Sequence, residues 1–327
     1  MANGGIIGPV NTIQACSQAE VITKVTSSTP SAVTTQPLTT TINYVIAAGG
    51  GGGGSTGGGS GGGGGAGGLR SGSCISVSGN TALGAVVIGA GGSALADGGN
   101  SSLVIGCTTY TSQGGGKGAK SFSGFADAGT GGSGGGGQGY TAPQSSAAGA
   151  AGNTPPTSPS QGNPGGDGAE APSPTHSGAN AQAAGGGGGA GAAGVDACQP
   201  SPTLSNGGAG GAGLDLSPLV GTTAGVCGVF SGGGGGGKRM SPGTAGAGGS
   251  GGGGQGAQGP NTRSAGAGIV NTGGGGGGGG EGPSSGTGGA GGAGVVVIKE
   301  PEIVASASGV WSMQTVYDQR LNNNWVT

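Results

Sequence analysis

The pattern that most suggests chemistry in this sequence is Gly232–Lys238, which fits the first seven positions of a phosphate-binding loop, GxxxxGK. In such a loop, backbone N–H groups cradle the phosphates of a nucleotide, and a following Ser or Thr hydroxyl binds magnesium. Residue 239 is Arg239, so this hydroxyl is missing, and no clear βαβ context surrounds the segment. In a chain so rich in glycine the pattern arises by chance, and the sequence does not predict nucleotide binding.

The titratable side chains do not form a catalytic or metal-binding pattern. His176 is the only histidine, which argues against a Ser–His–Asp triad and against a multi-histidine metal site. Six acidic residues lie in different segments, and nothing in their spacing supports a carboxylate pair: Asp97, Asp127, Asp167, Glu170, Asp196 and Asp215. We therefore predict that the protein is not an enzyme and needs no metal or cofactor.

The five cysteines are odd in number, widely scattered and free of any CxxC pair. This distribution argues against a disulfide framework or a zinc site. It predicts small buried thiols instead, at Cys16, Cys74, Cys107, Cys198 and Cys227.

A few larger side chains stand next to glycine runs, where they could contact a ligand. Residues 238–240 are predicted to form a compact, exposed basic and apolar tip, and we expect the histidine on a solvated loop. Two interpretations stay open: these side chains contact a glycan or a membrane protein, or they cap the ends of the glycine segments. The candidates are Tyr140, His176, Phe230, Lys238, Arg239 and Met240.

Glycine itself dominates the composition, with 97 of 327 residues, and it occurs in long runs. Such a run offers no side chain to bury, so it is either disordered or ordered by something other than side-chain packing. Only 6% of the residues are charged and the net charge is −2, unlike most disordered segments. We therefore predict an ordered body. The longest runs are Gly49–Gly54, Gly61–Gly65, Gly185–Gly189, Gly232–Gly237 and Gly273–Gly280.

The residues that interrupt the glycine runs recur at every third position, as Thr287, Ala290 and Ala293 do. Three residues per turn is the repeat of the extended polyproline II helix, which has no internal hydrogen bonds. Without Cβ atoms, neighbouring helices can approach closely enough to pair their backbone groups. The predicted fold is irregular and all-β-like, with stacked polyglycine II helices, short flanking β-strands and a short C-terminal helix.

Along the chain we expect three regions: an N-terminal arm over 1–40, a glycine-rich polyglycine-helix domain over 41–299, and a C-terminal aromatic tail over 300–327. Residues 41–48 and 295–299 are predicted strands that bracket the body and could pair to close it. The richer connectors are expected at the ends of the stack. They cover residues 140–183, 195–206, 214–231, 238–244 and 260–272.

The C-terminal tail has the one convincing helical pattern in the sequence. Apolar residues between 308 and 324 recur on one helical face, and Ser308 could cap the helix. Aromatic area is concentrated there, so we expect the tail to dock against its own chain, a sister copy or another protein. Its candidate docking residues are Trp311, Tyr317 and Trp325.

Several classes of protein are excluded by composition. No apolar stretch reaches 18 residues, so we expect no membrane-embedded segment, and the first residues lack the pattern of a signal peptide. No basic tract is present, which argues against nucleic-acid binding.

Three segments carry a resemblance to a known family. Ile42–Gly49, Val86–Gly92 and Gly294–Ile298 resemble the glycine-rich domain of bacteriophage tail-fibre proteins, adhesins and related phage virion structural proteins. The resemblance covers roughly residues 40–299, and the N-terminal arm and aromatic tail depart from the tip adhesins.

The resemblance implies a virion protein on the exterior of a phage particle, most readily a tail-fibre or appendage component. Its inter-rod loops would contact a host cell-surface glycan or outer-membrane protein, and it would assemble with other virion proteins, as a homotrimer by analogy. The alternative is a purely structural capsid-decorating or fibre-shaft protein, and a third reading is an ice-binding protein.

Overall fold

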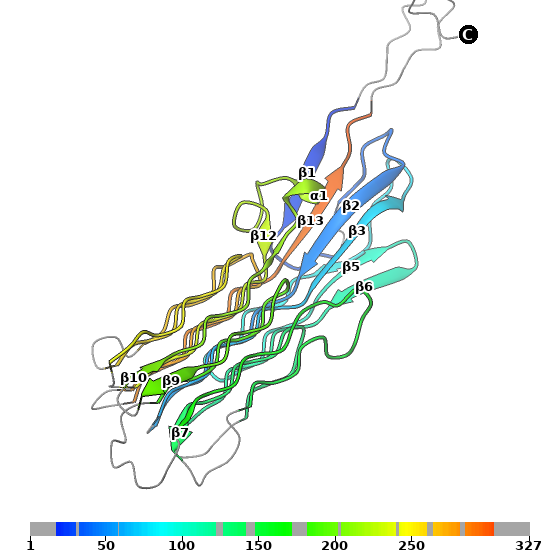
Figure 1. Cartoon of the computed structure of the whole chain (residues 1–327). Coiled ribbons are helices and arrows are strands. Elements are labelled where there is room, and N and C mark those ends of the chain that lie inside the picture. The colour runs from blue at the N-terminus through cyan, green and yellow to red at the C-terminus, as the bar shows by residue number, and fades with distance from the viewer. Residues whose placement is uncertain are drawn as a thin grey trace, which may run out of the picture.

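The computed structural model describes residues 18–30, 33–57, 59–121, 127–141, 148–171, 182–201, 204–239, 242–259, 264–281 and 285–303. The protein is elongated. A β-sheet head occupies one end, and its strands continue into a bundle of extended glycine-rich segments that run to the opposite end, called the distal end below (Figure 1).

The head is built on a four-stranded antiparallel sheet in the order β1-β13-β2-β3. The predicted pairing of the two bracketing strands is confirmed, because Val295 lies opposite Ala47 and Lys299 opposite Asn43. The sheet also includes β1, from the segment predicted as an N-terminal arm. Its strands are β1 (Val21–Val25), β2 (Thr41–Ala47), β3 (Leu69–Ser76) and β13 (Val295–Glu300).

The two central strands, β2 and β13, are buried on both faces, which explains why they read as nearly continuous apolar runs, whereas the edge strands β1 and β3 are partly exposed. A second antiparallel sheet covers one face, where β2 contributes Ile42, Tyr44 and Ile46 to the core. Its strands are β4 (Val86–Val87), β5 (Ser101–Ile105) and β6 (Thr108–Ser112). The other face of β2 presents Val45 and Ala47 to a second core.

The second core is covered by residues 214–231, which were predicted to be a connector at the end of a glycine segment. The segment does connect two glycine segments at the head end of the bundle, but it is more than a surface loop, because it folds back over the sheet and buries Val220 and Phe230 against it. It contains β11 (Leu214–Asp215), β12 (Val229–Phe230) and the helix α1 (Ser217–Val220), whose first turn holds a proline. This four-residue helix was not predicted from the sequence. The helix predicted within 308–324 lies outside the described residues.

The interior glycine segments are ordered by backbone hydrogen bonds between segments, and the partners change with a period of three. In Gly49–Gly54, the N–H groups of Gly49 and Gly52 donate to Gly99 and Ala96, at 2.9 Å each. The N–H groups of Gly50 and Gly53 donate to residues 292 and 289, and those of Gly51 and Gly54 donate to residues 65 and 62. The carbonyl groups of the run follow the same period. Those of Gly49 and Gly52 accept from residues 115 and 118, those of Gly50 and Gly53 from residues 92 and 95, and those of Gly51 and Gly54 from residues 276 and 279. Every peptide group is therefore satisfied by a neighbouring segment.

The five longest glycine runs lie in the interior of this bundle, and all of their residues are buried. A side chain would not fit there: a Cβ on Gly276 would lie 2.7 Å from the carbonyl carbon of Gly289. The prediction that the glycine segments are buried is confirmed, and close contact between main chains is the reason that these runs contain only glycine.

The outer segments follow a different rule. Thr287 and Ala290 are exposed, whereas Gly286 and Gly289 beside them are buried. A segment at the surface has one open edge in three, so one residue in three can carry a side chain. The period-three interruptions in the sequence therefore mark surface segments, and unbroken glycine marks interior ones.

Two of the predicted connectors contain further extended segments, so their assignment as loops is wrong in part. Within 140–183, Gly165 donates to Ala150 at 3.0 Å and Gly166 donates to Gly186 at 2.8 Å. Within 260–272, Gly268 donates to Ala290 at 2.8 Å. These outer segments need fewer glycines, because their open edges accept Ala, Asn and Asp.

Acidic side chains complete the hydrogen bonding of some outer segments. Asp196 Oδ1 accepts from the N–H of Asp167, and Asp167 Oδ1 accepts from the N–H of Gly149, both at 2.8 Å. Asp97 Oδ1 accepts from the N–H of Lys117 in the same way. These carboxylates replace the carbonyl groups that a further neighbouring segment would have supplied.

A buried carboxylate fastens residues 33–40 to the head sheet. Glu300 is 2% exposed, and its Oε2 accepts from Thr39 Oγ1 at 2.5 Å and from the N–H of Gln36 at 2.7 Å. Gln18 Nε2 donates to Thr39 Oγ1 at 2.7 Å and extends this network.

We expect Glu300→Ala to lower the free energy of unfolding by about 1–3 kcal/mol, because it leaves buried donors without an acceptor. Chemical denaturation measures the change. Glu20→Ala is the matched control: Glu20 binds Lys299 at 2.8 Å but is largely exposed, so its loss should cost at most about 1 kcal/mol. Equal effects for both variants would contradict this account of residues 33–40.

Candidate binding surface at the distal end

The chain reverses between glycine segments at both ends of the bundle, at turns such as 250–252 and 270–273 facing the head and at several further places at the distal end. Backbone bridges join neighbouring segments there, between Ser60 and Gly139, between Ala183 and Lys238, and between Lys238 and Gln258. The N–H of Thr56 donates to Gly286 at 2.9 Å at the same end. The bundle therefore holds the starting points of several loops in fixed relative positions (Figure 1).

Two short pairs of strands lie among these loops. The pair β7 (Tyr140–Thr141) and β8 (Glu170–Ala171) is parallel, and the pair β9 (Cys198–Ser201) and β10 (Leu204–Asn206) is antiparallel. Asn206 Oδ1 accepts from the N–H of Thr244 at 3.0 Å, which ties the second pair to the connector after residue 238. Neither pair was predicted from the sequence, because strands of two to four residues are too short to show a periodic pattern.

Buried polar side chains gather beneath the distal loops. Ser60 and Ser121 are fully buried, and Gln138, Gln182 and Lys238 are at most 2% exposed. The predicted exposure of Lys238 at a tip is wrong. Its segment continues among neighbours that include Ala257, which accepts from the N–H of Lys238 at 3.0 Å. Burial lowers the pKa of the Lys238 ammonium, because the charged form loses its hydration.

Chemical labelling can check the burial of Lys238. We expect an amine-reactive ester to modify the exposed Lys24 in the native protein and to leave Lys238 unmodified, with both lysines reacting after unfolding. Peptide mass spectrometry reads out each site. Equal labelling of the two lysines in the native protein would mean that Lys238 is exposed, as the sequence predicted.

The remaining candidate residues fall in three groups. Tyr140 lies in β7 at the distal end, and Arg239 is half-buried there, where its N–H donates to the carbonyl of Gln182 at 2.9 Å. Phe230 is fully buried in the head, at the opposite end of the molecule, so its assignment to a loop tip is wrong. Its place before a glycine run was read as a tip, but that run begins at the head. The other candidates lie outside the described residues: His176, Met240, Trp311, Tyr317 and Trp325.

The cysteines also differ from the prediction. The four that the structure describes are free and exposed rather than buried, namely Cys74, Cys107, Cys198 and Cys227. Each lies outside the two apolar cores, which are filled by branched and aromatic side chains. Cys16 lies outside the described residues.

In the described part of the chain, no three His, Cys, Asp or Glu side chains come together as a metal site would require. Asp97, Asp167 and Asp196 serve as acceptors for backbone N–H groups, as described above. The distal end thus combines loops with a bundle whose segments are joined by backbone hydrogen bonds, an arrangement suited to binding rather than to metal coordination.

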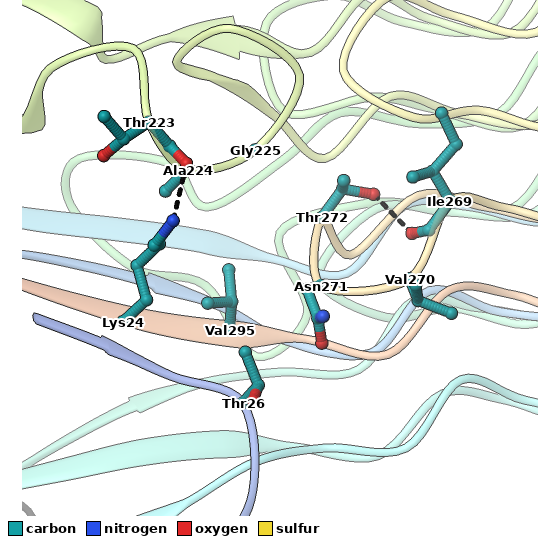
Figure 2. A pocket seen from close by; sticks show the side chains of 10 residues that line it. All are labelled: Lys24, Thr26, Thr223, Ala224, Gly225, Ile269, Val270, Asn271, Thr272 and Val295. Carbon is teal, nitrogen blue, oxygen red and sulfur yellow. Dashed lines mark hydrogen bonds between the residues drawn. The ribbon is translucent and has the colours of Figure 1, made fainter.

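A second concave feature lies where the head meets the glycine segments. It is a groove of about 410 Å³ between the end of β1, residues 223–225 and the turn at residues 269–272 (Figure 2). Val295 lies at its floor, and Lys24 reaches across one end to donate to the carbonyl of Thr223 at 2.9 Å. Two large apolar side chains at its rim are exposed, Ile269 at 51% and Val270 at 67%.

Within the described residues, no helix is long and apolar enough to cross a lipid bilayer. A search of curated proteins finds no match to this chain. The glycine-rich domain family matches residues 26–300, a range that begins directly after β1, ends with β13 and includes the glycine bundle. The chain therefore belongs to the glycine-rich domain family.

Proposed function

We propose that the interior segments are polyglycine II helices. Their hydrogen-bond partners repeat every three residues, which is the number of residues per turn of a polyproline II helix. The exposed interruptions of the outer segments follow the same period. Such a bundle is stiff because each helix is fixed by bonds on all sides, and a side chain is excluded wherever two backbones meet.

We further propose that the protein is a component of a phage appendage, such as a tail fibre, on the exterior of the virion. The observation that carries this proposal is the separation of the two ends of the molecule. Gln18 and Ile303, the first and last described residues, pair beside the head, whereas backbone bridges at the opposite end hold the starting points of several loops together. One end is suited to attachment and the other to contact with a partner.

In this proposal the distal loops recognise a glycan or an outer-membrane protein on the host surface. The stiff bundle holds the loops in place, so sequence changes in a loop alter recognition without disturbing the frame. The proposed role is structural and adhesive rather than enzymatic, with no cofactor. Partners would be other virion proteins and, by analogy, further copies of this chain in a trimer.

Replacing loops at the two ends tests the proposal. We expect exchange of residues 172–181, which join β8 to the next glycine segment, for a sequence of different composition to abolish binding of the labelled, purified protein to susceptible bacterial cells. The matched control is a similar exchange at residues 77–82, a loop of the head. Unchanged cell binding after distal exchanges at several loops would contradict the proposed adhesion. Antibody labelling that places the protein on the capsid, with no cell binding, would favour a decorating role.

A further inference from the structure

We propose that the groove at the junction of head and bundle is the docking site for residues 304–327 of the same chain. These residues lie outside the described part, and they contain both tryptophans of the protein, Trp311 and Trp325. The proposed segment packs along β1 and places apolar side chains against Ile269 and Val270.

The groove opens at a gap in the edge of the head sheet. Val25 is the last residue of β1 that pairs with β13, and Thr29 then bridges to Val86 of the second sheet. Because the chain leaves β13 after Val25, no strand covers the edge of β13 at Val295. Ile269 and Val270 remain largely exposed at the rim, and clustered apolar exposure of this kind marks a contact surface.

The described chain ends close enough for its own continuation to reach the groove. Ile303 and Gln18 exchange two backbone hydrogen bonds, at 2.8 and 2.9 Å, so the segment starts beside the beginning of β1. The seven residues from Gln18 to Lys24 span about 20 Å as a strand. The helix predicted over 308–324 would measure about 25 Å, so it would extend from this exit to the groove.

The chemistry of the segment complements the groove. Its predicted helix carries an apolar face of Val310, Met313, Tyr317 and Leu321. It also contains a single acidic residue, Asp318. Lys24, at the end of the groove, donates one bond to the carbonyl of Thr223 and has further N–H donors for a carboxylate. The segment also contains Arg320, so its side chains carry no net charge; the apolar matching, together with Asp318 as a carboxylate for Lys24, favours it as the occupant.

Tryptophan fluorescence tests the proposal, because every tryptophan of the full-length protein lies in the segment. We expect a blue-shifted emission that acrylamide quenches poorly, with no dependence on protein concentration. Val270→Lys should shift the emission to the red and raise the quenching constant several-fold. The matched control is Val195→Lys, which alters another largely exposed valine (54%) on an outer glycine segment and should leave the fluorescence unchanged.

Three outcomes would overturn the proposal. Fully accessible tryptophans in the unaltered protein would mean that the segment does not dock on this chain. Protection that appears only at high protein concentration would assign the groove or the segment to a second copy. Protection that survives Val270→Lys, with far-UV circular dichroism unchanged, would place the docking site elsewhere.

Discussion

The substitution Gly276→Val is expected to prevent assembly of the glycine bundle. Gly276 donates to Gly51 at 2.9 Å and accepts from Gly64 at 2.8 Å, and a Cβ would collide with the carbonyl group of Gly289. Overpacking an ordinary core costs about 1–3 kcal/mol, because side chains can rearrange. Here the obstacle is main chain that is itself hydrogen-bonded, so the cost should exceed that range. Yield of soluble protein and hydrogen exchange measure the effect.

A valine at an outer position provides the matched control. Ala290 is exposed and lies on a segment that contacts the same part of the bundle. We expect Ala290→Val to change the free energy of unfolding by no more than about 0.5 kcal/mol. If both variants behaved alike, the distinction between interior and surface segments would be lost.

The second large effect is expected from Phe230→Ala in the head. Phe230 is fully buried among Val45, Val220 and Val297, and the truncation removes an aromatic ring from the second core. Substitutions of this kind cost about 3–5 kcal/mol. Denaturant unfolding followed by circular dichroism gives the change in free energy.

The strand partner of Phe230 serves as its control. Leu214 pairs with Phe230 between β11 and β12 but is 43% exposed. Leu214→Ala should therefore cost much less than the phenylalanine truncation. A small effect of Phe230→Ala would mean that residues 214–231 do not hold the head sheet.

The sequence could predict the ordered glycine body because two features were local. Unbroken runs such as Gly273–Gly280 leave backbone contact as the only means of order, and the spacing of Thr287, Ala290 and Ala293 indicates a repeat of three residues. The pairing of the strands that contain Val45 and Val297 followed from their position at the two borders of the body.

Other features depended on the path of the chain between segments, which no local pattern records. Phe230 and Lys238 stand at the two ends of one glycine run, and each looked like a tip. The first belongs to the head core, and the second is enclosed by segments distant in sequence. The segments around Gly149 and Gly165 were missed because their open edges accept other residues, which hides the glycine signal.

Hydrogen exchange at Gly273–Gly280 in the full-length protein tests the central claim most directly. Each N–H of this run from Gly274 on to Gly279 donates to an acceptor in another segment or, at Gly274, to Thr272 Oγ1. Amides bonded in this way should exchange about a thousandfold or more slowly than those of a free peptide, as in a cooperatively folded core. Exchange at the rate of a free peptide would contradict the account, because the glycine segments would then have no fixed partners.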